Sequence, residues 1–451
     1  MTACLVKKIR NILSFLPKSQ KGADFVALRL CAFVALRRGQ VLLALLSCAP
    51  LYGQRNEILD PDIRTLKVER NGQWNSLPYL ELGSADRLHI TFDVMSHEYR
   101  RLRYRIEPMT WDWQHNERLL SSEFLRRGIG DEAIEDYEES INTTVLYTNY
   151  RFIFPGPETE IGLSGNYRLV VYDDDESEDV VIIPFYITED AARLSARITT
   201  NTDIDFNATH QQLTYTLQPL PPLTIHYPES EVHTVVMQNK RSSSAVYDPK
   251  PDYITPTGLQ WEHSRDLIFP AGNEYRKFEM TTLKYGGIGM DNIRWFDPYY
   301  HATLFTDEVR RNYIYDEEQN GSFYINDIDH PEPDVEADYV FVHFALQAAP
   351  DLKGDIYLNG EFTADHFGPE YRMEYNPDSG LYENTQLLKL GYYNYQYLYQ
   401  PRSGARPSTA EIQGNFFQAE NRYTILAYYS ERGSRYDRLI ALSDFQFSLT
   451  K

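Results

Sequence analysis

Apolar and polar residues alternate in short segments along most of the chain after residue 55. In Arg87–Val94, RLHITFDV, and in Arg100–Ile106, RRLRYRI, every second side chain is apolar over most of the segment. Successive side chains of a β-strand point to opposite faces, so this alternation predicts strands with one buried face. Six further segments predict strands: 166–172, 180–187, 212–217, 233–238, 275–283 and 301–305.

The pattern favours an all-β fold built of consecutive immunoglobulin-like β-sandwich domains. The acidic stretch DDDESED at 173–179 separates two apolar runs and therefore predicts a hairpin. Antiparallel strands at this spacing are typical of immunoglobulin-like sandwiches. The chain contains 35 Tyr and 22 Phe, and aromatic side chains favour strands. Only 117–127, ERLLSSEFLRR, has helical spacing, and it predicts either one short helix or a loop.

The chain of 451 residues is long enough for roughly two to four domains. We expect an export signal within 1–54. The stretch before about residue 30 resembles neither a signal nor a domain, so a start codon further along the chain is an alternative. A first sandwich is then expected at 55–190, a middle one at 195–334 and a C-terminal one at 336–451. The stretch 239–258 contains three prolines and little apolar periodicity, so it predicts a long loop in the middle domain.

The first 54 residues have the composition of a secretory signal peptide. They carry eight basic residues and one acidic residue, and an apolar run at 41–46 precedes Pro50 and Gly53. The run is shorter than the roughly 20 apolar residues that span a bilayer. We expect cleavage before Gln54 and export of the chain that follows. The alternative is a lipid anchor at Cys48, because LLSC at 45–48 is similar to a lipobox.

The exported chain is strongly acidic. The whole chain has 44 basic and 65 acidic residues, so 36 basic and 64 acidic residues remain after residue 54, a net charge of −28. This charge argues against binding to nucleic acid or to an anionic membrane surface, both of which require positive potential. All three cysteines lie within the first 48 residues, so the stability of the exported chain must come from core burial rather than disulfides.

The sequence does not predict an enzyme. It contains no H-E-x-x-H, G-x-S-x-G or G-K-[ST] phosphate-loop motif, and no cysteine follows Cys48. His226 and His233 are seven residues apart, with no pattern that would bring both to one metal. We therefore assign no catalytic, cofactor-binding or metal-ligating residue and expect no cofactor.

Two groups of residues are candidates for a contact with a partner protein. Arg101, Arg103 and Arg105 form one face of a predicted strand in an otherwise acidic chain. They can contact an acidic partner, or they can pair with acidic side chains across the strand. Trp111 and Trp113 follow the same strand and can form an exposed aromatic anchor, although core packing is expected of at least one of them.

Tyrosine-rich blocks recur in a fixed order along the chain. Four of them are YTNYRFIFP from Tyr147, LSGNYRLVVYD from Leu163, GNEYRKFEM from Gly272 and LKLGYYNYQYLY from Leu388; the fifth, from Gly414, is GNFFQAENRYTILAYYSERGSRYDRLIAL. In this order the blocks resemble the plug protein family of the type IX secretion system of Bacteroidetes, over about 63–442. The resemblance implies a non-enzymatic protein that closes the periplasmic opening of the outer-membrane translocon barrel when no substrate is passing. It further implies a periplasmic protein at the inner face of the outer membrane, which is monomeric apart from that partner and has no transmembrane segment of its own.

The C-terminal part also resembles the glycogen-binding type of immunoglobulin-like module. The turn NGEF at 359–362 and the strand GYYNYQYLY at 391–399 carry this resemblance. It leaves an alternative function, a carbohydrate-binding accessory protein of the cell envelope. However, such modules place Trp shortly after the turn, where this chain has His366 and Phe367, and its five tryptophans all precede residue 296. Tyr393, Tyr395, Tyr397 and Tyr399 share one strand parity, and we expect them to face a core rather than a ligand.

Overall fold

The computed structural model describes residues 54–449, except 351 and 405. The predicted export signal and the alternative lipid site at Cys48 lie outside the described residues. The described chain is nearly all β, which confirms the predicted fold class. Its α-helices are single turns: α3 (Ser121–Phe124), α4 (Pro228–Glu231) and α5 (Pro333–Glu336). None of the helices in the described part is long and apolar enough to cross a membrane.

The first sandwich pairs two antiparallel sheets around one apolar core. One sheet has the order β1 (Glu57–Ile58), β12 (Glu178–Thr188), β11 (Gly165–Asp173), β5 (Leu102–Met109) and β7 (Asp131–Ala133), with β3 (Tyr79–Glu81) parallel to β12. The other has the order β2 (Ile63–Arg70), β4 (Leu88–Val94), β9 (Thr148–Phe154) and β8 (Asp136–Glu139). The alternating apolar residues of β4 and β5 point into this core, so both predicted strands and the predicted hairpin β11–β12 are confirmed.

The segment with helical spacing contributes little helix. Its single turn α3 leads directly into β6 (Leu125–Arg127), which pairs with β10 (Glu160–Ile161). Phe124 at the end of the turn is 1% exposed and belongs to the first core. Burial of this one ring holds the helical turn against the core. The sequence predicted either one short helix or a loop here, and the structure has the short helix.

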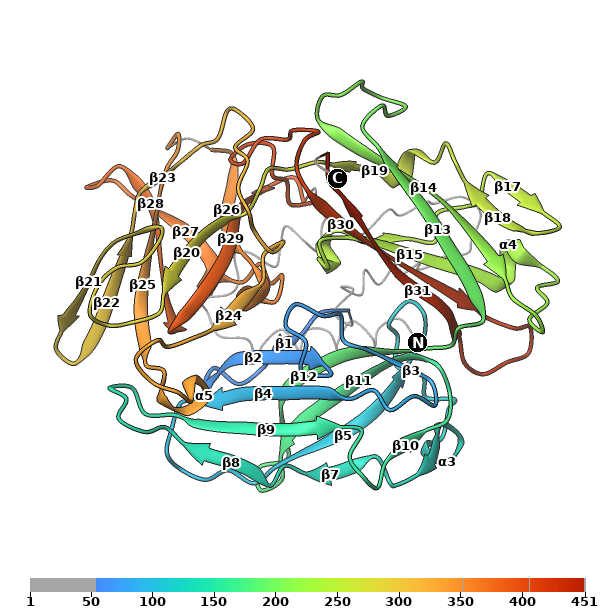
Figure 1. The fold of residues 1–451 in the computed structure, drawn as a ribbon, viewed down its shortest axis with the longest axis horizontal. Helices are drawn as coiled ribbons and strands as arrows, with labels where there is room; N and C mark the ends of the chain where they lie inside the picture. The colour runs from blue at the N-terminus through green and yellow to red at the C-terminus, as the bar shows by residue number, and fades with distance from the viewer. Residues whose placement is uncertain (1–53, 351, 405, 450–451) are drawn as a thin grey trace, which may run out of the picture. The chain divides into compact units, whose positions relative to one another are not determined.

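The second sandwich combines two distant parts of the chain. One sheet has the order β13 (Ala192–Thr199), β14 (His210–Pro219), β18 (Gly258–Trp261) and β17 (Tyr253–Thr255), with β19 (Ile268–Pro270) also on β14. The facing sheet has the order β16 (Val246–Tyr247), β15 (Val232–Gln238), β30 (Asn421–Tyr429) and β31 (Arg438–Phe447). Figure 1 shows β30 and β31, coloured red at the end of the chain, beside β15.

This pairing differs from the predicted division of the chain at 334–336. The hairpin β30–β31 completes the second sandwich instead of the C-terminal one, since β30 pairs with β15 from Val232↔Tyr429 to Gln238↔Tyr423. Ile425 and Ala427 are fully buried and pack in the same core as Trp261. Alternation in a sequence reports that one face is buried, but it does not name the strand that covers it.

The third sandwich holds the remaining ten strands. Its path is β20 (Arg276–Met280), β29 (Gly391–Pro401), β26 (Gly354–Asn359), β27 (Arg372–Asn376), β28 (Leu381–Lys389), β25 (Tyr339–Gln347), β22 (Tyr299–Leu304) and β21 (Met290–Phe296). The short strands β23 (Asp307–Glu308) and β24 (Phe323–Ile325) pair with β25 and β29. Tyr393, Tyr395, Tyr397 and Tyr399 are buried in its core, which confirms the predicted direction of the four rings.

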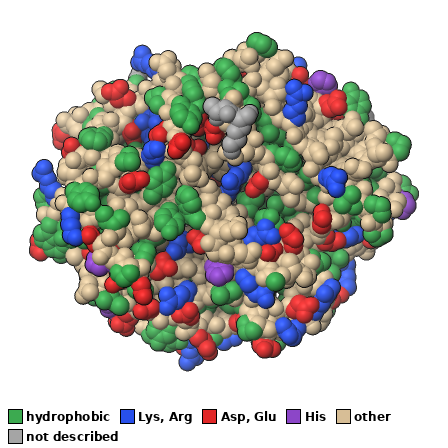
Figure 2. All heavy atoms as spheres, viewed as in Figure 1, with side chains coloured by type: hydrophobic (Ala, Val, Ile, Leu, Met, Phe, Trp, Pro, Cys, Tyr) green, Lys and Arg blue, Asp and Glu red, His purple; other side chains and the backbone are tan. Residues whose placement is uncertain are grey.

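Three of the four hydroxyls of this tyrosine row find acceptors at the edge of the core. Tyr395 and Tyr397 each donate to Asp307 Oδ2 over 2.8 Å, and Tyr393 donates to the carbonyl of Lys389 over 2.6 Å. These bonds satisfy polar groups whose burial would otherwise be costly. On the outside of the molecule, acidic, basic and hydrophobic side chains are interspersed over the face drawn in Figure 2.

Candidate functional site

The candidate site is the region where the three sandwiches meet. Its polar contacts join side chains of different sandwiches, which are far apart in the chain. All described residues belong to one compact unit, 52–451. The contacts fall into a buried ion pair, an aromatic joint and a small polar cavity. Each holds two or three sandwiches together.

A buried ion pair joins the first and third sandwiches. Lys389 Nζ lies 2.8 Å from Asp93 Oδ2, and each side chain is 1% exposed. Tyr339 donates its hydroxyl to the same carboxylate over 2.6 Å, and the Lys389 ammonium lies 4.0 Å from the centre of the Tyr147 ring. Burial lowers the pKa of Lys389, and the charge of Asp93 acts against that shift. Because neither charge can be solvated in place, each depends on the other sandwich for its partner.

The two candidate tryptophans form the joint between the first and second sandwiches. The Trp111 ring stacks on His233 with a centroid distance of 4.3 Å and an angle of 2°. The Trp111 amide donates to Asp437 over 2.9 Å. Trp113 is only 4% exposed and meets the Tyr186 ring edge to face. The suggestion of an exposed anchor is therefore wrong for Trp113, because its ring is covered by the second sandwich; core packing of one of the two rings is confirmed.

The arginine row on β5 is paired with acidic side chains within the chain. Arg103 binds Asp131 over 2.7 Å, and Arg105 binds Asp179 over 2.7 Å. Arg101 lies 3.4 Å from Asp174 and is more exposed than the other two. The hydrogen bonds that Arg105 donates to the Asp179 carboxylate raise the pKa of Arg105. This is the cross-strand arrangement that the sequence allowed as one reading, while a contact of the row with an acidic partner stays a prediction.

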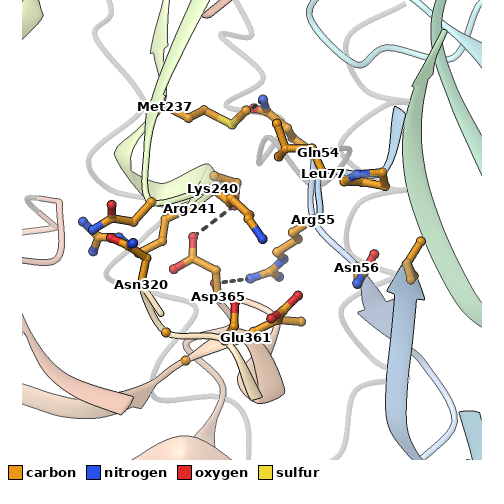
Figure 3. Close-up of a pocket in the computed structure, with 18 of the residues that line it drawn as sticks. Gln54, Arg55, Asn56, Leu77, Met237, Lys240, Arg241, Asn320, Glu361 and Asp365 are labelled. Carbon is orange, nitrogen blue, oxygen red and sulfur yellow. Dashed lines mark hydrogen bonds between the residues drawn. The ribbon is translucent and has the colours of Figure 1, made fainter. Parts of the chain in front are cut away.

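A polar cavity of about 130 Å³ lies between the three sandwiches. Figure 3 shows Gln54 and Arg55 from the first, Lys240 and Arg241 from the second and Asp365 from the third around it. This volume is well below the roughly 300 Å³ at which small-molecule sites begin. The cavity therefore lacks the room for an ordinary ligand, and its polar groups serve the joint.

Asp365 is the central acceptor of this cavity. Its carboxylate accepts hydrogen bonds from the Ser243 amide over 2.7 Å and from the Ser242 hydroxyl over 3.1 Å. Asn359, in the turn that resembles sugar-binding modules, donates to it over 3.0 Å. Arg55 donates to the Asp365 carbonyl over 2.9 Å, a bond drawn in Figure 3. The side chain and the main-chain carbonyl of Asp365 together thus connect all three sandwiches, and Asn359 of the turn that carried the carbohydrate resemblance is engaged in a contact within the chain.

The segment between the second and third sandwiches carries a buried acid that the sequence did not reveal. Glu274 is 2% exposed and accepts the Tyr313 hydroxyl over 2.6 Å, while its Oε2 has no hydrogen-bond partner among the described residues. Burial raises the pKa of Glu274 to about 7 and that of Glu318 to about 8. Both carboxyls therefore retain their protons to higher pH in the folded chain.

We expect the variant Glu274→Gln to be more stable than the wild type above pH 7. The folded chain holds the Glu274 proton up to about pH 7, against an ordinary value of 4.5. The stability of the wild type therefore falls as the pH rises from about 4.5 to 7, because the unfolded chain loses the proton first. The amide removes the buried charge, a gain on the order of 1–3 kcal/mol at pH 8 and little at pH 4.

Urea unfolding at the two pH values measures this difference, with Glu262→Gln as an exposed control. An equal effect of Glu274→Gln at pH 4 and pH 8 contradicts the assignment of a buried proton to Glu274.

The joints do not resemble a catalytic centre. No group of three or more His, Cys, Asp or Glu side chains in the described ranges could hold a metal ion. The strongly shifted acids and tyrosines are explained by burial at cores and joints, and the stacked His233 is held by Trp111 and Asp248. The joint residues can fix three domains in one orientation, and the cavity at Asp365 is too small for an ordinary ligand.

These features define a class of protein, a compact all-β body of several sandwiches. A family model described as the type 9 secretion system plug protein 1st domain matches residues 63–189, which is the first sandwich. A crystal structure of a hypothetical protein from Parabacteroides merdae is 37% identical, covers 87% of this chain and 99% of its own, and superposes with a TM-score of 0.84. The first sandwich of the chain therefore belongs to the type 9 secretion system plug protein family.

Other solved structures are much less similar. The BSP domain of a biofilm-associated protein is 8% identical, with coverage of 86% of this chain and 60% of that one and a TM-score of 0.17. A structure named BspA_C_WT is also 8% identical, with coverage of 87% and 97% and a TM-score of 0.15. At these scores neither bears on the fold, and the resemblance of the C-terminal part to glycogen-binding modules is not confirmed. None of the curated proteins compared with the chain matches it.

Proposed function

We propose that the protein is a non-enzymatic periplasmic plug that binds the periplasmic opening of the type IX translocon barrel and closes it when no substrate is passing. The match of the first sandwich to the plug family supports a role in type IX secretion. The observation that carries the plug role is the joining of three sandwiches through buried polar contacts. An obstructing body must keep its shape under solvent and cargo pressure, and independent domains on flexible linkers would not.

The joints supply that stiffness without any disulfide in the described residues. Lys389 and Asp93 tie the third sandwich to the first, Trp111 and His233 tie the first to the second, and Asp365 links all three. Opening a joint would expose charges and rings that are now covered. A chain held in this way can cover an opening as one piece.

A sealing contact must be large and reversible. Barrels of many strands enclose a water-filled lumen, and one wide enough for folded cargo would leak solutes. We expect the contact to bury more than roughly 1,000 Å² and to be specified by complementary charge rather than by apolar area alone. The acidic body, with a net charge of −28 after residue 54, then favours a partner surface with basic residues and disfavours anionic lipid.

Deletion of the protein is expected to raise the permeability of the outer membrane to large hydrophilic compounds while secretion continues at least in part. The physical reason is an open lumen, which solutes larger than ordinary porin substrates can cross. Uptake of a hydrophilic antibiotic or dye too large for porins measures this, with the complemented strain as control. Unchanged permeability in cells that still hold the assembled translocon contradicts the plug role.

A further inference from the structure

The sheet of the third sandwich ends in a free edge strand. In the order of this sheet β21 is the last strand, and no strand of the described part pairs with its outer side. Its partner β22 pairs on the other side with β25. Figure 1 shows β21 at the margin of the ribbon. A free edge presents unpaired backbone N–H and C=O groups, and proteins usually shorten or cover such edges. β21 is seven residues long, with Trp295 46% and Phe296 58% exposed.

Aromatic side chains continue from this edge over the outer face of the sheet. The register places Phe296 opposite Tyr299, and Phe341 beside His301. The ring centroids of Tyr299 and Phe341 are 5.2 Å apart. The His301 ring stacks on Phe341 with a centroid distance of 5.3 Å and on His343 with one of 5.1 Å. Between these positions Val340 and Val342 point to the core and are fully buried. The outer face of β21, β22 and β25 is therefore an aromatic surface, which we call the aromatic edge; it is exposed at Phe296 and Tyr299 and half-buried at His301, Phe341 and His343.

The charge of the aromatic edge differs from that of the rest of the body. Its outer-face positions from Asn292 to Phe296, from Tyr299 to Thr303 and from Phe341 to His343 include no carboxylate. Arg294, opposite His301 on this face, makes no hydrogen bond or ion pair within the described residues. In a chain with 64 acidic residues after residue 54, an unpaired guanidinium among aromatic rings complements an acidic side chain of a partner.

The geometry disfavours a sugar or a lipid surface as the occupant. A sugar stacks on rings that lie in one plane, but Tyr299 and Phe341 meet at 70° and Phe296 and His301 at 87°. An anionic lipid surface is disfavoured by the net charge of −28. An extended strand fits both the unpaired backbone edge of β21 and the aromatic rings beside it. It can pair with that edge and place alternate side chains over the rings.

We propose that the aromatic edge binds an extended strand of the translocon partner by adding it to β21. The strand would place an apolar side chain beside Phe296 and, two residues along on the same face, an acidic side chain that pairs with Arg294. This inference rests on the proposed function and names the surface by which the protein engages its partner. Backbone pairing along β21 would form one part of the larger sealing contact, because a single added strand covers only a small area.

Site-specific photo-crosslinking in the native host tests the proposal. A benzoylphenylalanine residue replaces Phe296 in one strain and Phe206, which is 70% exposed on the second sandwich, in the control strain. In parallel, tagged Phe296→Asp and Arg294→Glu proteins are compared with Phe206→Asp for recovery of the translocon barrel in mild detergent. We expect a crosslink to the barrel from position 296 only, and about a tenfold loss of barrel from the two edge variants.

The outcomes separate this inference from the proposed function. Wild-type protein that recovers the barrel, together with edge variants that recover it equally well and no crosslink at 296, overturns the aromatic edge alone. Wild-type protein that recovers no barrel overturns both. Circular dichroism of each variant shows whether it folds, and the crosslink at 296 remains a test if an aspartate variant does not.

Discussion

Replacement of Lys389 by Met is expected to destabilise the folded protein by about 3–5 kcal/mol, the range for breaking a buried pair by removing one partner. The variant leaves Asp93 without its cation at a position where both side chains are 1% exposed. The hydrogen bonds from Tyr339 and Asn149 remain, but they cannot replace a full charge. Denaturant unfolding of the purified protein measures the loss.

The matched control is Lys277→Met. Lys277 lies 2.7 Å from Asp316, in a pair whose side chains are 22% and 37% exposed. Partly exposed pairs contribute roughly 0–1 kcal/mol, so this variant should stay close to the wild type. A double variant, Lys389→Met with Asp93→Asn, should regain part of the loss because it removes the uncompensated charge. Equal losses from Lys389→Met and Lys277→Met contradict the role of the buried pair as a joint.

The second sandwich is expected to fold only when it contains the end of the chain. A fragment of 195–334, the division predicted from the sequence, lacks β30 and β31, which supply Ile425, Ala427 and other core residues. Each large apolar side chain left exposed forfeits about 1.5–3 kcal/mol, so such a fragment cannot form its core. We expect it to lack cooperative unfolding in calorimetry.

A fragment that joins 192–271 to 420–449 through a short glycine-rich linker is the positive counterpart. Asn421 donates its side-chain amide to the Ala271 carbonyl over 2.9 Å, so the two ends to be linked already lie together. This fragment should show dispersed amide signals and a single unfolding transition. A cooperative 195–334 fragment, or an unfolded linked fragment, would show that the hairpin is not an integral part of the sandwich.

The strands could be predicted from the sequence because alternation is a local signal. Leu102, Tyr104 and Ile106 are buried, and the arginines between them face outwards. The partner of each strand could not be predicted in the same way. β30 begins 183 residues after the end of β15, which it covers, and neither segment carries a sign of the other. Long-range pairing is decided by which apolar faces fit together in the folded chain.

For the candidate site, too, local features could be predicted from the sequence and long-range contacts could not. Trp111 and Trp113 were visible as unusual residues, but their exposure depended on a second sandwich whose position the sequence does not encode locally. Lys389 and Asp93, 296 residues apart, had no signal at all. Asp365 follows the turn at 359–362, which drew attention for its resemblance to sugar-binding modules, yet it serves as an acceptor between domains.

Recovery of partners from the native envelope tests the central claim most directly. The tagged protein is purified in mild detergent, and the proteins that accompany it are identified and quantified by mass spectrometry. A plug that closes the translocon should bring down one very large outer-membrane barrel in near-stoichiometric amount. Glycan-uptake components, or nothing above the background of an untagged strain, would contradict the plug role.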